Sequence, residues 1–359
     1  MSQTDPIKPI QIQGPVCPLP HHHTETVVIG HGSGGQMTRD LIINIFQREI
    51  GNEFLAQGND AALITFKEAP GRIAISTDSH VVSPLFYPGG NIGRLSVSGT
   101  VNDVAMLGAV PAYLTAGFII EEGFSMDSLK QILISMAETC REAGVQIVAG
   151  DTKVVEKGSA DGLFINTAGF GIIPEGRQVG GQYAQPGDAV IISGSIGDHG
   201  IAVLQARGEL GFETEIKSDV APLNHMINDL LTAIPQVHVL RDPTRGGLAT
   251  TLKEIACQSQ VSIHLEEESI PVKQNVRTAC EMLGFDPLYL ANEGKVIVIL
   301  PQEKADDAIQ ILKSSPYGVM STRIGYVSQE DPGNVLLRTA FGTTRILDML
   351  AGEILPRIC

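Results

Sequence analysis

The sequence predicts an α+β (mixed α/β) fold with two domains and a flexible C-terminal tail. With 359 residues, the chain is longer than one ordinary hydrophobic core accommodates, so two domains are expected. Hydrophobic residues make up 43% of the chain and charged residues 18%, which indicates a globular protein and argues against a disordered one. In both halves, apolar β-rich runs alternate with segments of helical periodicity, as in mixed α/β packing.

The first half is predicted to hold a flexible arm and one domain. Residues 1–25 contain five prolines and few apolar positions, which favours an arm without packed elements. The first domain is predicted at residues 26–185. Its expected strands lie at 72–77, 112–119 and 145–149, and its expected helices at 92–107 and 125–143.

A polar stretch rich in glycine and proline, residues 174–188, predicts the domain boundary near residue 185. The second domain is predicted at residues 186–342, and residues 343–359 are predicted to form a mobile tail. The expected strands of this domain lie at 189–193, 237–240 and 296–300, with a helix after the glycine loop at 194–200 and another at 247–258.

The charge balance argues against two classes of partner. The net charge is −15, whereas surfaces that bind nucleic acid or anionic membranes need clustered lysine and arginine. No apolar run approaches the roughly 20 residues of a transmembrane helix, and the N-terminus lacks the pattern of a signal peptide. We therefore expect a cytoplasmic protein without nucleic-acid or membrane partners.

The five cysteines do not form a disulfide framework or a zinc motif, because their number is odd and no C-x-x-C pair occurs. Cys140, Cys257 and Cys280 lie in helical patterns and are expected in the core. Cys359 is the last residue, 17 residues beyond Gly342, so an extended tail reaches roughly 55 Å at about 3.3 Å per residue. Such a thiol can enter an active site of its own chain or of a partner; the alternative is an ordinary frayed terminus.

Four acidic residues stand where apolar runs end: Asp60, Asp78, Asp103 and Asp151. Mg²⁺ binds a few carboxylates and completes its shell with substrate phosphates, so this set predicts a metal site for a nucleoside triphosphate such as ATP. The alternative for Asp78 and Asp103 is a role as helix N-caps, which aspartate commonly fills.

Three glycine-rich loops precede helical patterns, and backbone N–H groups at such places bind phosphates. They contain Gly34 and Gly35, then His199, then Arg245, and none matches a P-loop. Ordinary turn formation explains each loop equally well.

Lys153 and Glu293 are candidates for proton transfer, because Lys153 lies at the end of a predicted buried strand and Glu293 just before another. Alternatively, Lys153 neutralises nearby carboxylates and Glu293 belongs to a surface turn.

Eight segments together resemble the HypE family of hydrogenase maturation proteins, within the aminoimidazole-ribonucleotide synthetase (PurM)-like superfamily. The resemblance runs from about His31 to the last residue, and its most specific part is the ending Pro356-Arg357-Ile358-Cys359. The segments are Gly32–Gln36, Ser76–Ser79, Pro88–Gly93, Asn102–Ala105, Gly150–Val154, Gly197–Gly200, Ala291–Lys295 and Pro356–Cys359.

The resemblance implies an ATP-dependent dehydration on the terminal thiol. In this family the carbamoyltransferase HypF loads a carbamoyl group onto the C-terminal cysteine, here Cys359, and ATP phosphorylates the carbamoyl oxygen. Loss of phosphate and of the amide protons leaves a thiocyanate, and the cyanide passes to iron on a HypC–HypD scaffold for [NiFe] hydrogenase.

The resemblance also implies the site residues and the assembly. Glu293 becomes the base, with Lys153 nearby, and the four aspartates hold Mg²⁺ on ATP. Further nucleotide contacts are expected from Asn102, Gly34, Gly35, His199 and Arg245. The N-terminal halves of the superfamily usually form a homodimer.

Two kinds of rival function stay open at this point. One is another ATP-dependent activity of the superfamily, such as a purine cyclo-ligase or a selenophosphate synthetase. A selenophosphate synthetase uses an N-terminal cysteine or selenocysteine, and the segment His31-Gly32-Ser33-Gly34-Gly35-Gln36 contains neither. The other rival is an ATP-responsive module whose tail docks on a partner without being modified. Cys359→Ala distinguishes the dehydratase from both rivals, because only the dehydratase needs the thiol for turnover.

Overall fold

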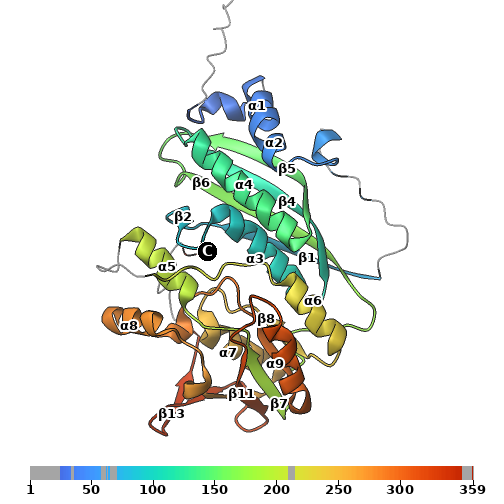
Figure 1. Ribbon diagram of the computed structural model, residues 1–359, viewed down its shortest axis with the longest axis vertical. Coiled ribbons are helices and arrows are strands. Elements are labelled where there is room, and N and C mark those ends of the chain that lie inside the picture. The colour runs from blue at the N-terminus through green and yellow to red at the C-terminus, as the bar shows by residue number, and fades with distance from the viewer. Residues whose placement is uncertain are drawn as a thin grey trace, which may run out of the picture.

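The computed structural model describes residues 25–33, 36–57, 62, 64, 71–208, 215–349 and 358. These residues form two α/β halves stacked along the long axis of the molecule (Figure 1). The predicted arm at 1–25 lies outside the described residues, apart from Glu25.

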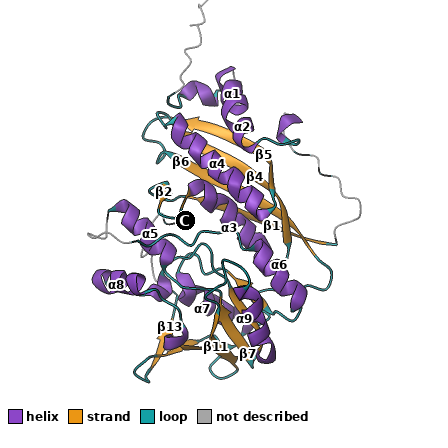
Figure 2. Ribbon diagram, in the orientation of Figure 1, coloured by secondary structure: helices purple, strands orange, loops and turns teal. Residues whose placement is uncertain are grey.

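In the first half, two helices cover one face of a four-stranded sheet (Figure 2). The strand order is β1-β6-β4-β5; β4 and β5 run parallel, and the other pairs are antiparallel. The elements are η1 (Ile29–Gly32), α1 (Gln36–Leu41), η2 (Ile42–Phe46), α2 (Gln47–Ile50), η3 (Leu55–Gln57), β1 (Arg72–His80), β2 (Phe86–Tyr87), β3 (Gly90–Asn91), α3 (Ile92–Met106), β4 (Val110–Glu121), α4 (Met126–Ala143), β5 (Gln146–Val155) and β6 (Leu163–Ile173).

Local sequence explains where the two covering helices begin. The Asn91 side chain caps α3 by accepting hydrogen bonds from the backbone N–H groups of Gly93 and Arg94, and Ser125 caps α4 in the same way. Side chains of β4 alternate between the two faces of the sheet, so Leu114 and Phe118 are buried under the helices. The opposite face is partly exposed and apolar, with Ile119 on it.

The described residues of the second half form a seven-stranded sheet of order β13-β12-β9-β11-β7-β10-β8. The elements are β7 (Asp188–Ile192), α5 (Asp198–Arg207), α6 (Asn224–Ala233), β8 (Val239–Arg241), α7 (Gly247–Ser259), β9 (Ser262–Glu266), η4 (Glu267–Ser269), α8 (Gln274–Leu283), η5 (Pro287–Tyr289), β10 (Ile297–Pro301), η6 (Gln302–Lys304), α9 (Ala305–Lys313), β11 (Thr322–Ser328), β12 (Val335–Arg338) and β13 (Thr344–Leu347).

The central strand β7 is buried on both faces, which explains its uninterrupted apolar sequence. Val190 and Ile192 pack in one hydrophobic cluster with residues of α7, whereas Ala189 and Ile191 pack in another with residues of α6 and α9. This sheet therefore fixes the start of α7 and the end of β8, where part of the candidate site lies.

The predicted strands and helices are present, with shifts of a few residues at their ends. The predicted boundary near residue 185 falls between β6 and β7. Among the elements absent from the sequence prediction are β6, β9, β11 and β12. Across the described part of the chain, no helix combines the length and apolar character that crossing a membrane requires.

Two sequence expectations are wrong. Residues 344–347 form β13, which pairs with β12, so they belong to the second sheet and not to a mobile tail. Cys257 lies on the exposed side of α7, whereas Cys140 and Cys280 are buried as expected. Periodicity placed Cys257 in a helix correctly but did not fix which side of α7 faces the core.

Candidate active site between the two halves

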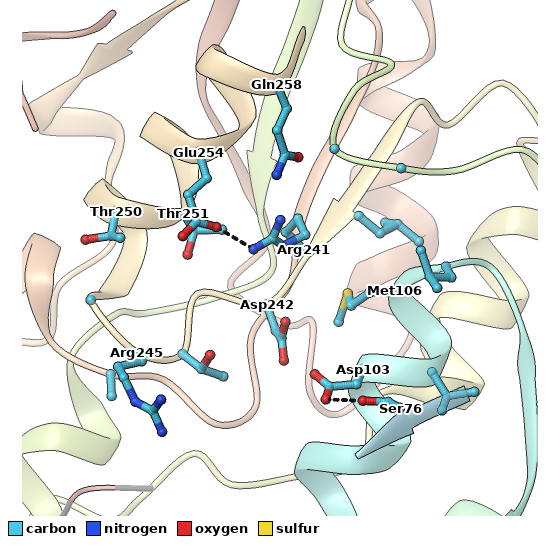
Figure 3. Close-up of a pocket in the computed structure, with 18 of the residues that line it drawn as sticks. Ser76, Asp103, Met106, Arg241, Asp242, Arg245, Thr250, Thr251, Glu254 and Gln258 are labelled. Carbon is cyan, nitrogen blue, oxygen red and sulfur yellow. Dashed lines mark hydrogen bonds and ion pairs between the residues drawn. The ribbon is translucent and has the colours of Figure 1, made fainter. Parts of the chain in front are cut away.

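A cleft of about 1270 Å³ lies between the two halves of the molecule. Ser76 of β1 and Asp103 and Met106 of α3 line one wall, and residues from β8 and α7 line the other (Figure 3). Ile358, the residue before the C-terminal cysteine, also lines the cleft. The penultimate residue of the chain therefore lies at the site.

Acidic side chains from both halves meet in this cleft. The carboxylates of Asp103 and Asp242 point into the same region (Figure 3). Burial, with repulsion from Asp103 and Asp78, raises the pKa of Asp242 to about 7. Burial raises the pKa of Asp103 to about 6, with repulsion from Asp78 adding to it and a hydrogen bond from Ser76 at 2.8 Å opposing it. The cleft thus concentrates carboxyl groups whose mutual repulsion Arg241 only partly offsets.

The start of α7 contributes the glycine-rich loop with Arg245. Gly246 caps the helix in the left-handed conformation, with φ of 79°. A Cβ on Gly247 would lie 2.6 Å from the Leu288 carbonyl oxygen, so close packing also requires this glycine. Arg245 and Gly246 line the cleft next to Thr250. This geometry allows backbone N–H groups to face an anion.

Glu293 is buried beside the acidic wall. Its Oε1 atom has no hydrogen-bond partner among the described residues, and only 4% of the residue is exposed. Burial, with repulsion from Asp242, Asp219, Asp78 and Asp103, raises the pKa of Glu293 well above its ordinary value. Such a carboxyl group is a weaker acid, and in its ionised form a stronger base, than an ordinary carboxyl group, which fits a proton-transfer role.

The backbone around Glu293 is held by a buried ion pair. Asp219 lies 3.0 Å from the Lys295 ammonium group, and its two oxygens accept hydrogen bonds from Glu293 N at 3.2 Å and Gly294 N at 3.3 Å. A Cβ on Gly294 would lie 1.8 Å from the Asp219 carbonyl oxygen. Glu293 is therefore fixed from its backbone while its side chain stays available.

His199 binds the tail, whereas the sequence prediction placed it at the phosphates. Its Nε2 atom lies 2.7 Å from the Ile358 carbonyl oxygen, and its Nδ1 atom lies 2.8 Å from Ser218 Oγ. The imidazole is fully buried, and neither nitrogen is left for a nucleotide. The phosphate prediction came from the glycine-rich loop around His199, whereas the folded chain places this residue against the tail.

Asp151 and Lys153 do not join Asp78 and Asp103 within one chain. They lie on β5, three strands away from β1, which is about 14 Å at the usual strand spacing. Register places Asp151 opposite Gly117 and Lys153 opposite Ile119, on the exposed face of the sheet. Asp78 lies on the other face, so Asp151 does not share a site with Asp78 within one chain.

Asn102 is structural, not a lining residue. Its side chain donates to the Ala221 carbonyl oxygen and accepts from Leu223 N, and it is 2% exposed. It therefore joins α3 to the second half of the chain. Asp60, Gly34, Gly35 and Cys359 lie outside the described residues. Within the described ranges, no group of three or more His, Cys, Asp or Glu side chains is placed to hold a metal ion.

Sequence reasoning missed Asp242, Asp219 and Lys295. A signal for Asp242 was present, because it follows a predicted strand and precedes the loop with Arg245, in the pattern used for the other aspartates. Nothing comparable marked Asp219, because it lies in an extended segment between α5 and α6 and meets Lys295 only in the folded chain.

The family called AIR synthase related protein, N-terminal domain, matches residues 58–173, and its C-terminal domain counterpart matches residues 185–338. Carbamoyl dehydratase HypE of Azotobacter vinelandii is 52% identical over 334 residues, which is 93% of this chain and 97% of that protein. The chain belongs to the HypE family.

Solved structures of the HypE family share the fold. One, the hydrogenase maturation protein HypE in complex with ATP, aligns with a TM-score of 0.89 at 50% identity and covers 93% of this chain and all of that one. Another, from a HypE–HypF complex, aligns with a TM-score of 0.76 at 53% identity and covers 86% and 99% of the two chains. The mixed α/β fold in two halves that the sequence predicts is confirmed.

Proposed function

We propose that the protein is an ATP-dependent carbamoyl dehydratase that converts S-carbamoyl Cys359 into S-cyanocysteine and so supplies cyanide for the iron of [NiFe] hydrogenase. One observation carries the assignment: the carbonyl group of Ile358 is bound by His199 at the edge of the acidic cleft. The acceptor residue is therefore one peptide bond from the site. Identity of 52% to a carbamoyl dehydratase supports the same reaction.

The reaction balances as two steps on the tail. The carbamoyl oxygen attacks the γ-phosphorus of ATP, ADP leaves, and the nitrogen loses one proton. The carbon–oxygen bond then breaks, phosphate leaves with the oxygen, and loss of the second proton forms the carbon–nitrogen triple bond. Phosphorylation is needed because an unmodified amide oxygen is a poor leaving group. The net change is loss of one water and hydrolysis of one ATP.

Glu293 is the proton-transfer group in this proposal. It is buried and has one carboxylate oxygen without a partner among the described residues. Its raised pKa makes the ionised form a stronger base than an ordinary carboxylate. The backbone contacts to Asp219 keep it in place while the proton moves.

The donor set fits Mg²⁺ bound together with ATP. Asp103 and Asp242 line the cleft and would supply carboxylate oxygens, which Mg²⁺ prefers, and their mutual repulsion, with that from Asp78, supports a cation at this place. These residues, with Asp60, would hold the metal. The metal would neutralise charge on the transferring phosphoryl group. Arg245 and the N–H groups at the start of α7 would face the phosphates.

The assembly we propose is a homodimer formed through the exposed face of the first sheet. Ile75 is 68% exposed and Ile119 is 44% exposed on this face, which leaves apolar surface in contact with water. Asp151 and Lys153 lie on the same face and cannot reach the cleft of their own chain. In the dimer they serve the cleft of the partner subunit.

Mixed dimers test this arrangement. Lys153→Ala and Glu293→Gln homodimers are expected to be inactive. Random mixing of the two variants is expected to restore about a quarter of wild-type activity, because half of the dimers then carry one complete site of two. No recovery on mixing would contradict a role for Lys153 across the interface.

HypF is the proposed source of the carbamoyl group, and a HypC–HypD scaffold the proposed acceptor of the cyanide. A HypE–HypF complex has been solved for a relative that aligns with 86% of this chain. The reaction belongs in the cytoplasm, with no nucleic acid or membrane among its partners.

Intact-mass measurement tests the reaction. With HypF, carbamoyl phosphate and Mg·ATP, the wild-type chain is expected to gain the mass of a cyano group. Glu293→Gln is expected to accumulate the carbamoyl adduct, and Cys359→Ala to gain nothing. Uptake of a carbamoyl group by the wild type without loss of water would overturn the dehydratase assignment.

A further inference from the structure

His199 uses both of its ring nitrogens in a buried chain of hydrogen bonds that ends on the tail. The carbonyl oxygen of Ile358 can only accept, so Nε2 of His199 must carry the hydrogen of the 2.7 Å contact. In the neutral ring, Nδ1 is then an acceptor, and the hydroxyl of Ser218 donates to it at 2.8 Å. Val220 N in turn donates to Ser218 Oγ at 3.1 Å, which completes the chain.

This network selects one tautomer of His199. Burial lowers the pKa of His199, so the imidazole is neutral at physiological pH. The Tyr87 ring packs edge-on against it, with ring centroids 5.4 Å apart. The Nε2–H group therefore points at the tail in the folded protein before any ligand binds.

The side chain of Ile358 is held as firmly as its carbonyl group. It is 6% exposed and belongs to the same hydrophobic cluster as Tyr87, Val220 and Ala291. Tyr87 comes from the first half of the molecule and the other two from the second. Both halves therefore hold the penultimate residue of the tail.

The segment that orients His199 also orients Glu293. Ser218 contacts the imidazole, and the next residue, Asp219, accepts hydrogen bonds from the backbone of Glu293 and Gly294. A tail peptide bound by His199 is consequently placed at a fixed distance from the proton-transfer group.

We propose that His199 is a positioning residue that binds the backbone of the docked tail through Nε2–H. The tail must then leave His199 before a carbamoyltransferase can reach Cys359. The expected effect on dehydration rests on the function proposed above, whereas the docking of the tail does not depend on that function. Because the contact is to a backbone carbonyl group, it forms whatever group the Cys359 sulfur carries. Loss of the contact should then affect loading and dehydration in opposite directions.

Two substitutions at position 199 separate this role from simple packing. His199→Asn puts an amide near the place of Nδ1, so it keeps a partner for Ser218 but does not reach the tail. His199→Gln puts an amide N–H near the place of Nε2 and keeps the donor to Ile358. The first readout is the rate of iodoacetamide labelling at Cys359, measured by peptide mapping with exposed Cys257 as the internal reference. The second is the single-turnover rate of dehydration of the carbamoylated chain with Mg·ATP.

We expect His199→Asn to label Cys359 about tenfold faster than wild type, which is the value of one hydrogen bond, and to dehydrate about tenfold more slowly. The KM for ATP should stay unchanged, and His199→Gln should recover most of both rates. Equal labelling in His199→Asn and wild type, or equal defects in the two variants, would overturn the proposal. If labelling follows the prediction while the wild type never dehydrates, the docking stands and the proposed function fails.

A measurement on the unmutated histidine keeps the proposal testable if His199→Asn does not fold. Imidazole ¹⁵N NMR of the full chain is expected to show His199 as the Nε2–H tautomer with a slowly exchanging proton. Removing Ile358 and Cys359 should make that proton exchange rapidly. An Nδ1–H tautomer, or slow exchange that survives the truncation, would contradict the contact.

Discussion

Asp219 and Asp242 are two carboxylates that both repel Glu293, and their pKa values are shifted in opposite directions. Burial alone would raise the pKa of both. At Asp219, the Lys295 ammonium group 3.0 Å away reverses this and lowers the pKa. At Asp242, burial prevails, repulsion from Asp103 and Asp78 adds to it, and the pKa rises to about 7.

Within this small region, one carboxylate therefore has a structural role, and the others belong to the proposed active site. The carboxylate that holds the backbone of Glu293 has its cation built into the chain. Among the described residues, Arg241 offsets only part of the repulsion among Asp78, Asp103 and Asp242. A cation that arrives with the substrate would relieve this repulsion, which is why we propose Mg·ATP, and not ATP alone, as the ligand of the acidic cleft.

Removal of the built-in cation is expected to have the largest effect. Lys295→Met leaves Asp219 buried and unpaired, which should lower the free energy of unfolding by about 3–5 kcal/mol. Urea unfolding at pH 7.5 measures it. Adding Asp219→Asn to the same chain should recover much of the loss, because the unpaired charge disappears. If Lys295→Met alone is as stable as wild type, the ion pair does not stabilise this region.

The same substitution at the two aspartates should change stability with opposite signs. Asp242→Asn removes repulsion and should raise the free energy of unfolding of the ligand-free protein by about 1 kcal/mol, while the dehydration rate falls about 100-fold or more. Asp219→Asn should destabilise, because it leaves Lys295 unpaired. Urea unfolding and single-turnover kinetics test the pair. Destabilisation by both substitutions would remove the contrast.

The two carboxylates also predict opposite pH responses. Asp103 and Asp242 keep their protons in the folded state up to about pH 6 and about pH 7, whereas an unfolded aspartate loses its proton near 3.8. The folded state therefore binds more protons in this window, and ligand-free stability should fall by several kcal/mol as the pH rises from about 4 to about 7.

Asp219 changes the stability at acidic pH. Its pKa is lowered, so the stability that it contributes is present above 3.8 and is lost as the pH falls below that value. Asp242→Asn should flatten the upper part of the window and leave the acid limb unchanged. Urea midpoints measured across the pH range test both statements, and an unchanged slope between pH 5 and 7 in Asp242→Asn would count against the assigned pKa.

The smallest expected effect is on ligand-induced stabilisation. Protons compete with the metal at Asp103 and Asp242, so saturating Mg·ATP should raise Tm by a few degrees more at pH 8 than at pH 6. Asp242→Asn should reduce this difference. Equal shifts at the two pH values would place the metal away from these carboxylates.

The sequence predicted those parts of the site that local pattern determines. Asp78 and Asp103 were found because each stands where an apolar run ends, and Glu293 because it precedes a buried strand. Asp151 obeys the same pattern, yet it points to the opposite face of the sheet. The pairing of β4 with β5 and β6 decides that face, and no local window contains this information.

Contacts between distant residues account for the other differences. His199 meets Ile358 across 159 positions of the chain, so its role in holding the tail is not visible in its glycine-rich loop. Lys295 and Asp219 likewise meet only after folding. The reactive end of the chain was predictable from the terminal cysteine, but the residue that holds it was not.

Transfer of oxygen from the carbamoyl group to phosphate is the central claim, and isotope labelling measures it directly. The thiol of Cys359 is carbamoylated with ¹⁸O-labelled cyanate, the label at Cys359 is counted by peptide mapping, and Mg·ATP is added for a single turnover. We predict one ¹⁸O atom in the released phosphate for each S-cyanocysteine formed. Phosphate free of ¹⁸O would mean that water, and not the carbamoyl oxygen, accepts the phosphoryl group, and would contradict the account.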